Sequence, residues 1–211
     1  KSVDRKQNKD IVVLKKKVKK LENQQESKRW DVQTTPNSFG WNGAVYPLNE
    51  VPVGDADYQR EGSDLYMSSI DLKGAVEKNI ALTACTVRIL LVNLKLPRAA
   101  NITWAEIAQD AVPSGAPVIP TQLGTALAPN FQFNFGTRHG FEVLYDKRIE
   151  LNETTQNSVL FHIKRKLNRK TYFNEATTDV EKNKLFFCII SDENGANEPL
   201  IEFTSRIYFQ G

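Results

Sequence analysis

From about Arg29 to the end of the chain, short segments of alternating hydrophobic and polar residues are separated by Gly, Pro, Asn and Asp. Alternation with a period of two is typical of β-strands that bury one face, whereas helices repeat every 3.6 residues. Six segments follow the strand pattern clearly: residues 65–76, 87–94, 141–151, 159–164, 185–190 and 201–209. This pattern restricts the body of the chain to an all-β fold.

Within the strands, the pattern also predicts which side chains share a face. One such set is Tyr66, Ser68, Ile70, Leu72 and Val76; a second is Phe141, Val143, Tyr145, Ile149 and Leu151. Residues 87–94 and 185–190 are apolar on both faces, which predicts strands that are covered on two sides. Both patterns require a packed, layered structure.

Two further strands are expected from the segments around residues 29–34, 44–49 and 170–173. Eight antiparallel strands in two sheets predict an eight-stranded jelly-roll or a related sandwich. The long connection from Pro97 to Gly140 should contain a short helix at residues 104–109, with Thr103 as its N-cap. Loops of this length usually have a function, so we expect this one to contact other subunits or to decorate the surface.

Charge is distributed unevenly along the chain. Residues 1–29 contain eleven Lys and Arg against four Asp and Glu, a net charge of +7, whereas the remainder has 17 cations and 21 anions, a net charge of −4. A basic segment on a slightly acidic body is typical of a nucleic-acid-binding arm. We therefore divide the chain into a basic helical arm, residues 1–28, and a sandwich domain, residues 29–211.

The arm also has an apolar stripe, formed by Ile11, Leu14, Val18 and Leu21. Their spacing of 3, 4 and 3 places them on one face of a helix. A lone helix of this length is marginal in water, so it needs partners. Three such helices around a threefold axis would bury the stripe and leave the lysines facing nucleic acid; a solvated charged helix or a disordered tail is the alternative.

Phosphate binding requires cations at high local density rather than a specific motif. In the arm the candidates are Lys1, Arg5, Lys6, Lys9, Lys15, Lys16, Lys17, Lys19 and Lys20. A second basic cluster, expected at the end of a strand and in the turn after it, comprises Lys164, Arg165, Lys166, Arg169 and Lys170. This cluster could contact phosphates inside a shell, or it could equally be a solvated turn.

No catalytic motif is present in the sequence, so we expect a non-enzyme without catalytic residues, metal ligands or cofactors. His139 and His162 have no pairing motif, and Cys85 and Cys188 lie in apolar runs that predict buried free thiols. No segment has the length and hydrophobicity of a membrane span. Two acidic pairs, Asp55 with Asp57 and Asp192 with Glu193, could bind structural calcium, but turn chemistry explains them equally well.

Several segments occur in an order that resembles a known family. They are Glu26-Ser-Lys-Arg-Trp, Leu48-Asn-Glu-Val-Pro-Val-Gly-Asp, Gln59-Arg-Glu-Gly-Ser-Asp, Val87-Arg-Ile-Leu-Leu-Val, Phe141-Glu-Val-Leu-Tyr-Asp-Lys, Ser191-Asp and Ser205-Arg-Ile-Tyr-Phe. Together they resemble the coat proteins of satellite-tobacco-necrosis-like viruses and of small circular single-stranded DNA viruses that encode a replication initiator (CRESS-DNA viruses). The last two segments, Ser191-Asp and Ser205-Arg-Ile-Tyr-Phe, resemble the coat proteins of the DNA viruses more than those of the RNA satellites.

This resemblance implies a jelly-roll capsid protein that forms a T=1 icosahedral shell of sixty identical subunits in the virion, with the arm facing a single-stranded genome. It also implies assembly inside the host cell, with the nucleus as one location, and it identifies no host receptor. The alternatives are the coat protein of a satellite RNA virus, a trimeric jelly-roll ligand or lectin, and an enzyme on a sandwich scaffold. Neither a ligand nor a lectin needs a +7 arm.

Overall fold

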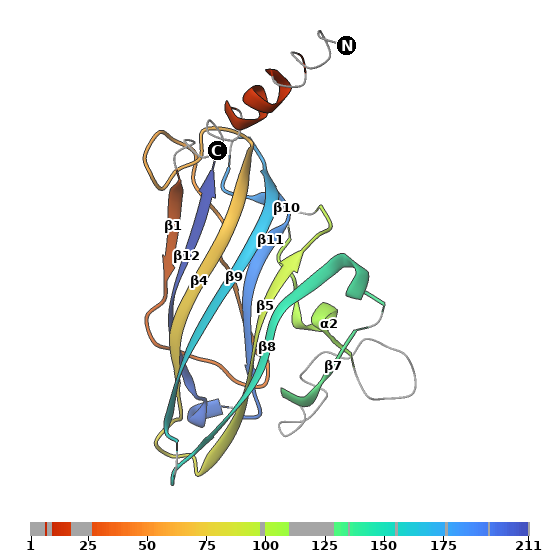
Figure 1. The fold of residues 1–211 in the computed structure, drawn as a ribbon. Coiled ribbons are helices and arrows are strands. Elements are labelled where there is room, and N and C mark those ends of the chain that lie inside the picture. Colours follow the sequence, from red (N-terminus) through yellow and green to blue (C-terminus); the bar gives the residue numbers. More distant parts are fainter. Residues whose placement is uncertain are drawn as a thin grey trace.

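The computed structural model describes residues 7, 10–17, 27–97, 100–109, 129–134, 136–154, 156–175, 177–193 and 195–210. Two antiparallel sheets pack face to face, and a helical segment projects beyond one end of them (Figure 1). No helix among these residues combines the length and apolar character that crossing a membrane requires.

The first sheet has the strand order β1-β12-β4-β9-β10, with β2 beside β12; the second has the order β3-β11-β5-β8. The strands of the first sheet are β1 (Lys28–Gln33), β2 (Asn37–Ser38), β4 (Asp64–Glu77), β9 (Ser158–Phe173), β10 (Val180–Lys182) and β12 (Leu200–Gln210). Those of the second are β3 (Ala44–Pro47), β5 (Ala84–Leu94), β8 (Phe141–Asn152) and β11 (Lys184–Ser191). The remaining elements are α2 (Trp104–Ile107), β6 (Ala108–Gln109), β7 (Gln132–Phe133), η3 (Arg138–Gly140) and η4 (Gly195–Asn197).

The long strands pair in a nested manner. β1 pairs with β12, β3 with β11, β4 with β9 and β5 with β8, so that the first strand meets the last and each inner pair follows in turn. This topology confirms the expected jelly roll of eight antiparallel strands. β1 and β3 supply the two additional strands; a separate strand at residues 170–173 was a wrong alternative, because these residues are the end of β9.

Aromatic side chains fill the space between the two sheets. The ring of Phe187 on β11 lies 5.7 Å from that of Phe161 and 4.8 Å from that of Phe203, and Tyr46 packs edge-on against Phe203. Gly74 pairs with both Phe161 and Phe203, and a Cβ at this position would lie 2.6 Å from the Phe161 ring. The glycine therefore makes room for two large rings on neighbouring strands.

A second apolar cluster covers the outer face of the β3-β11-β5-β8 sheet. Leu90, Phe186 and Ile190 lie on that face, and Trp104 of α2 and Phe131 pack onto them. This cluster confirms that β5 and β11 are covered on two sides, and it explains why both strands carry apolar side chains on both faces. The described part of the connection between β5 and β8 thus covers its own domain, whereas residues 110–128 lie outside the described part.

α2 begins where the sequence predicts but is shorter. The Thr103 backbone N–H donates to Glu106 Oε2 at 2.8 Å, as in a capping box, and the helix ends at Ile107 instead of residue 109. Arg88 fastens the returning chain to the sheet: it binds both carboxylate oxygens of Asp146, at 2.8 and 2.7 Å, and donates to the Phe131 carbonyl at 2.7 Å.

Two β-bulges overturn part of the predicted face pattern. A register shift between Met67 and Ser69 turns Tyr66 to the outer face, where it is 42% exposed, while Ile70 and Leu72 are buried as expected. A second shift opposite Leu91 and Val92 directs Phe141 and Val143 to the outer apolar cluster, away from Ile149 and Leu151 in the main core. A single extra residue reverses the alternation of a strand.

Candidate nucleic-acid interface

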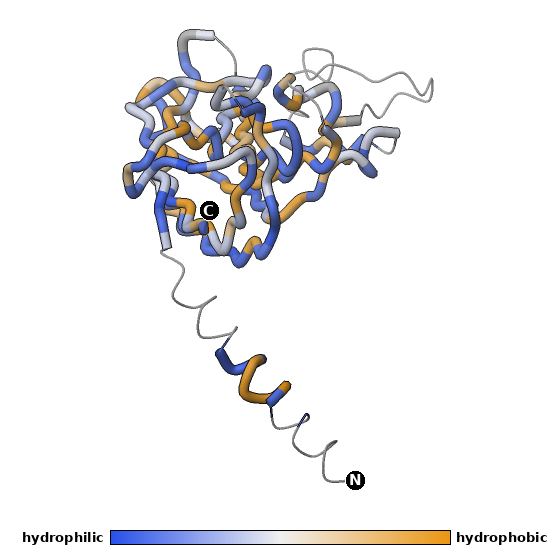
Figure 2. Tube along the Cα trace, turned by 90° about the horizontal axis from the view of Figure 1, so that it is seen from above, coloured by the Kyte–Doolittle hydropathy of each residue, from blue (hydrophilic) through white to orange (hydrophobic). Residues whose placement is uncertain are grey.

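The described part of the arm, residues 10–17, is helical and projects away from the sandwich (Figures 1 and 2). Ile11 and Leu14 are 48% and 59% exposed, and Lys15, Lys16 and Lys17 are exposed as well. The two described members of the apolar stripe are thus open to solvent, which fits a helix that needs partners. The other arm candidates lie outside the described residues and stay predictions: Lys1, Arg5, Lys6, Lys9, Val18, Lys19, Lys20 and Leu21.

Lys28 belongs to the sandwich rather than to the arm. It is the first residue of β1, it is buried, and its Nζ lies 2.5 Å from Glu61 Oε1. The next residue, Arg29, donates its backbone N–H to the Asp57 carbonyl. These contacts anchor the chain at the end of the sandwich from which the arm projects.

The second basic cluster lies within β9, not in a turn, so its predicted location was wrong. β9 runs without interruption from Ser158 to Phe173, and Asn168, with φ of 46°, marks a bulge instead of a reversal. The strand continues through these residues, where it pairs with β4 up to Tyr172.

β9 divides the cluster between two faces. Lys164, Lys166 and Lys170 lie on the outer, solvent-facing side of the first sheet. Arg165 and Arg169 alternate with them and reach across to β8, where Arg165 donates to the Leu144 carbonyl at 3.3 Å and Arg169 binds Glu142 at 3.1 Å. The two arginines therefore bridge the sheets, and only the three lysines remain on an open face.

Several outer-face cations are paired. Lys170 Nζ lies 2.5 Å from Asp64 Oδ2, and this contact raises the lysine pKa. Arg206 binds both oxygens of Asp31 at 2.7 Å, which lowers the pKa of that carboxyl group. Within the second basic cluster, the structure gives Lys164 and Lys166 no carboxylate partner among the described residues, so these two side chains are the members of the cluster most available to an anionic ligand.

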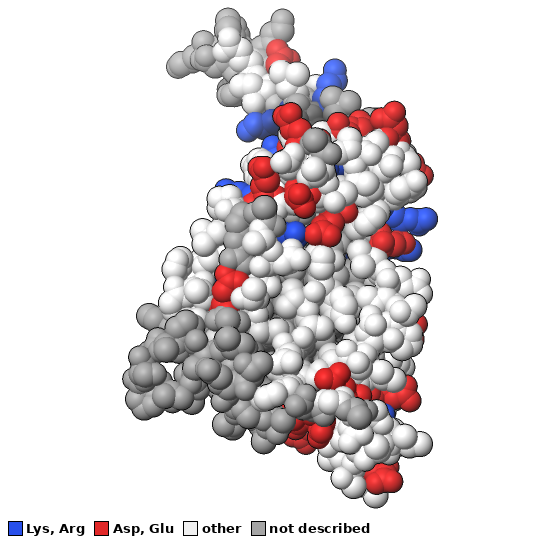
Figure 3. All heavy atoms as spheres, turned by 180° about the vertical axis from the view of Figure 1, so that it is seen from behind, with Lys and Arg blue, Asp and Glu red and all other residues white. Residues whose placement is uncertain are grey.

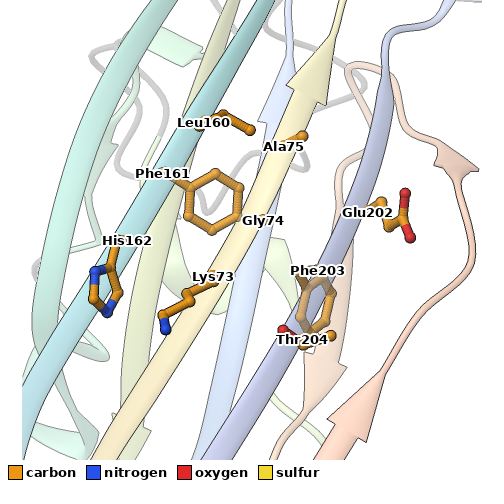
Figure 4. A pocket seen from close by; sticks show the side chains of 9 residues that line it. All are labelled: Lys73, Gly74, Ala75, Leu160, Phe161, His162, Glu202, Phe203 and Thr204. Carbon is orange, nitrogen blue, oxygen red and sulfur yellow. The ribbon is translucent and has the colours of Figure 1, made fainter.

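An open hollow of about 510 Å³ lies on the same face, nearer the opposite end of the sheet (Figure 4). Its lining is Lys73, Gly74, Ala75, Leu160, Phe161, His162, Glu202, Phe203 and Thr204. The hollow arises because the small Ala75 lies between Leu160 and Glu202. His162, as expected, is a surface histidine, and its Nε2 lies 2.8 Å from Asp71 Oδ1.

One of the acidic residues proposed for calcium holds a backbone N–H instead. Asp192 Oδ1 accepts the Thr86 N–H at 2.8 Å, which ties the end of β11 to the start of β5. Within the residues that the structure describes, no three His, Cys, Asp or Glu side chains are grouped as a metal site. Calcium binding at Asp55 with Asp57, or at Asp192 with Glu193, stays a prediction.

Both cysteines are buried free thiols, as predicted. Burial and the nearby Asp192 carboxylate raise the pKa of Cys85 to about 12, and burial alone raises the pKa of Cys188. The thiolate is the reactive form, so these pKa values leave both side chains unreactive near neutral pH.

Arg60 is a residue whose importance the sequence pattern did not reveal. Its guanidinium is buried and donates to four backbone carbonyls, those of Val51, Gly62, Asn174 and Thr177. It also lies 4.4 Å from the centroid of the Phe173 ring, and burial lowers its pKa. In the sequence it stands in Gln59-Arg-Glu-Gly-Ser-Asp, one of the segments that carry the family resemblance, and Gly62 of that segment provides one of the four carbonyls.

Comparison with known proteins gives distant likenesses. No family model and no curated protein matches the sequence. A solved structure titled turnip yellow mosaic virus matches with a TM-score of 0.35 and 11% identity, over 89% of this chain and 94% of that chain. A full particle of Israeli acute paralysis virus heated to 63 degrees matches with a TM-score of 0.31 and 10% identity, over 88% of this chain and 66% of that one. Both structures are of viruses, and the fold assignment here rests on the nested strand pairing.

Proposed function

We propose that this chain is a viral capsid protein that assembles with copies of itself into a small icosahedral shell around a nucleic-acid genome. The observation that supports this most strongly is the combination of a jelly-roll sandwich with a projecting cationic helix whose described stripe residues, Ile11 and Leu14, are exposed. In a monomer, the apolar stripe of such a helix would stay in contact with water. A symmetric assembly can bury its stripe and concentrate its lysines at the same time.

The surface charge supports self-association. Seen from behind, the molecule has few Lys and Arg side chains and a broad uncharged central area, with acidic groups gathered mainly toward the two ends (Figure 3). The cores of protein–protein interfaces are depleted of charged residues. We assign contacts between copies to this side and contacts with nucleic acid to the arm and to the outer face of the first sheet.

The finer parts of the proposal are a T=1 shell of sixty subunits, threefold contacts through the arm helices, and a circular single-stranded DNA genome of the CRESS-DNA type. Residue chemistry supports a polynucleotide ligand without distinguishing DNA from RNA, because phosphate contacts are blind to sugar and base. The chain would act in the virion, and no bond-breaking chemistry is required of it.

Nuclease protection tests the packaging step. Particles from the natural source are treated with nucleases, and the protected material is then extracted and digested separately with DNase and RNase. We expect protected, single-stranded, DNase-sensitive nucleic acid, because a closed shell excludes enzymes of this size. RNase-sensitive contents would replace the DNA assignment with the satellite RNA alternative, and particles without nucleic acid would contradict packaging.

A further inference from the structure

We propose that the end of the first sheet nearest the arm binds single-stranded nucleic acid by stacking bases on Tyr66 and Tyr172, with the phosphates held by the cations between them. This inference rests on the proposed function and deepens it: it adds a base-recognising surface, the tyrosine face, to a purely electrostatic arm. We define the tyrosine face as Tyr66, Tyr172 and Tyr208 with Arg29, Lys166, Lys170 and Lys182.

Strand register places these residues in three adjacent rows across the outer face. One row joins Gln210, Tyr66 and Lys170; the next joins Asp64, Tyr172 and Lys182; a third joins Arg29, Tyr208, Ser69 and Lys166. The three rows contain four cations and one anion. The following row, which pairs Asp31, Arg206, Asp71 and Lys164, is neutral, so positive charge and aromatic rings coincide at the arm end of the sheet.

The bulge in β4 creates this arrangement. Without the register shift between Met67 and Ser69, Tyr66 would share the buried face of Ile70 and Leu72. With it, Tyr66 and Tyr172 are both on the outer face and are 42% and 40% exposed. They are diagonal neighbours on adjacent strands, a separation of roughly 7–8 Å in a typical sheet, which suits successive bases of one extended strand.

Cations already surround the Tyr172 ring. The Nζ atoms of Lys170 and Lys182 lie 5.4 and 5.8 Å from its centroid. Proteins that bind single strands without sequence preference combine aromatic rings, on which bases stack, with cations that contact the phosphates. This works for any sequence, because every base has a π-face and every nucleotide has a phosphate. Beyond Tyr172 the hollow lined by Glu175 and Glu181 ends the positive area.

Stacking requires bases that are present and unpaired. The tyrosine face therefore predicts a preference for single strands with bases over strands without them, which the cations of the arm cannot supply. The test compares a twelve-nucleotide oligothymidylate with an abasic oligomer of the same length and charge, bound to the full chain under conditions that keep it unassembled. We expect the wild-type protein to prefer the oligothymidylate roughly ten-fold or more, since each base–aromatic stack contributes about that factor.

Two double variants and one single variant make the test specific. In Tyr66→Leu/Tyr172→Leu the preference should fall to near one while affinity for the abasic oligomer is unchanged, because no charge is removed. Tyr66→Phe/Tyr172→Phe keeps both rings and should keep the preference. Tyr58→Leu removes a more exposed tyrosine, 53% exposed, from the β3–β4 connection and should leave the preference unchanged.

Equal wild-type affinity for both oligomers would overturn the tyrosine face and leave electrostatic nucleic-acid binding intact. An equal loss of preference in Tyr58→Leu would also overturn it. If the wild-type chain bound neither oligomer, the proposed function would fail as well, so the two failures are distinguishable.

Discussion

Removal of residues 1–20 should abolish most of the salt-dependent affinity for nucleic acid while leaving the β-sandwich folded. This segment carries nine Lys and Arg residues. For single strands, the logarithm of the binding constant falls with the logarithm of salt concentration by roughly 0.7 for each phosphate neutralised. If all nine cations contact phosphates, the slope should become shallower by about 6.

A variant that keeps the helix separates charge from structure. Replacement of Lys15, Lys16, Lys17, Lys19 and Lys20 by Gln retains helix propensity and should reduce the slope by about 3.5. Lys147→Gln, which removes one exposed lysine from β8, is the matched control and should change the slope by less than 1. Binding titrations between 50 and 300 mM salt give the slopes, and circular dichroism checks the fold. An unchanged slope in the five-lysine variant would refute the arm as the phosphate-binding element.

Arg60→Leu should destabilise the sandwich by about 2–4 kcal/mol, because hydrogen bonds to a charged group contribute about 1.5–3 kcal/mol each and neighbouring ones are not additive. The substitution removes the guanidinium donor from the carbonyls of Val51, Gly62, Asn174 and Thr177. The stability of Arg60→Lys should lie between those of the wild-type protein and Arg60→Leu. An ammonium keeps the positive charge but cannot donate to four carbonyls as the planar guanidinium does. Urea unfolding of the unassembled chain measures the differences.

Arg148→Leu supplies the control for this comparison. Arg148 is an exposed arginine on β8, so its replacement should change the free energy of unfolding by less than about 0.5 kcal/mol. If Arg60→Leu behaved like Arg148→Leu, the four carbonyls would be satisfied in another way, and Arg60 would not hold the two loops together.

Local alternation was sufficient to predict the strands with a regular pleat. Ile201, Phe203, Ile207 and Phe209 all face the core as their spacing indicates, and the two-sided burial of β5 and β11 followed from the apolar residues on both of their faces. Tyr66 was misplaced because a bulge depends on how β4 pairs with both of its neighbours, and no local pattern encodes that pairing.

The same limit applies to the candidate site. Lys164, Lys166 and Lys170 could be named from composition, but their separation from Arg165 and Arg169 depends on the contact between β9 and β8. The neighbours of Tyr172 come from β4 and β10, more than a hundred residues and about ten residues away along the chain. Arg60 likewise joins two loops far apart in sequence, so only the folded chain reveals its role.

The mass of the purified full chain in dilute physiological buffer tests the central claim most directly. Sedimentation velocity or mass photometry should find a closed particle with a protein mass of about 1.4 MDa, which corresponds to sixty copies of a 23.9 kDa chain. A stable monomer that neither associates nor retains polynucleotide would contradict the account, and a discrete trimer would favour a ligand or lectin instead.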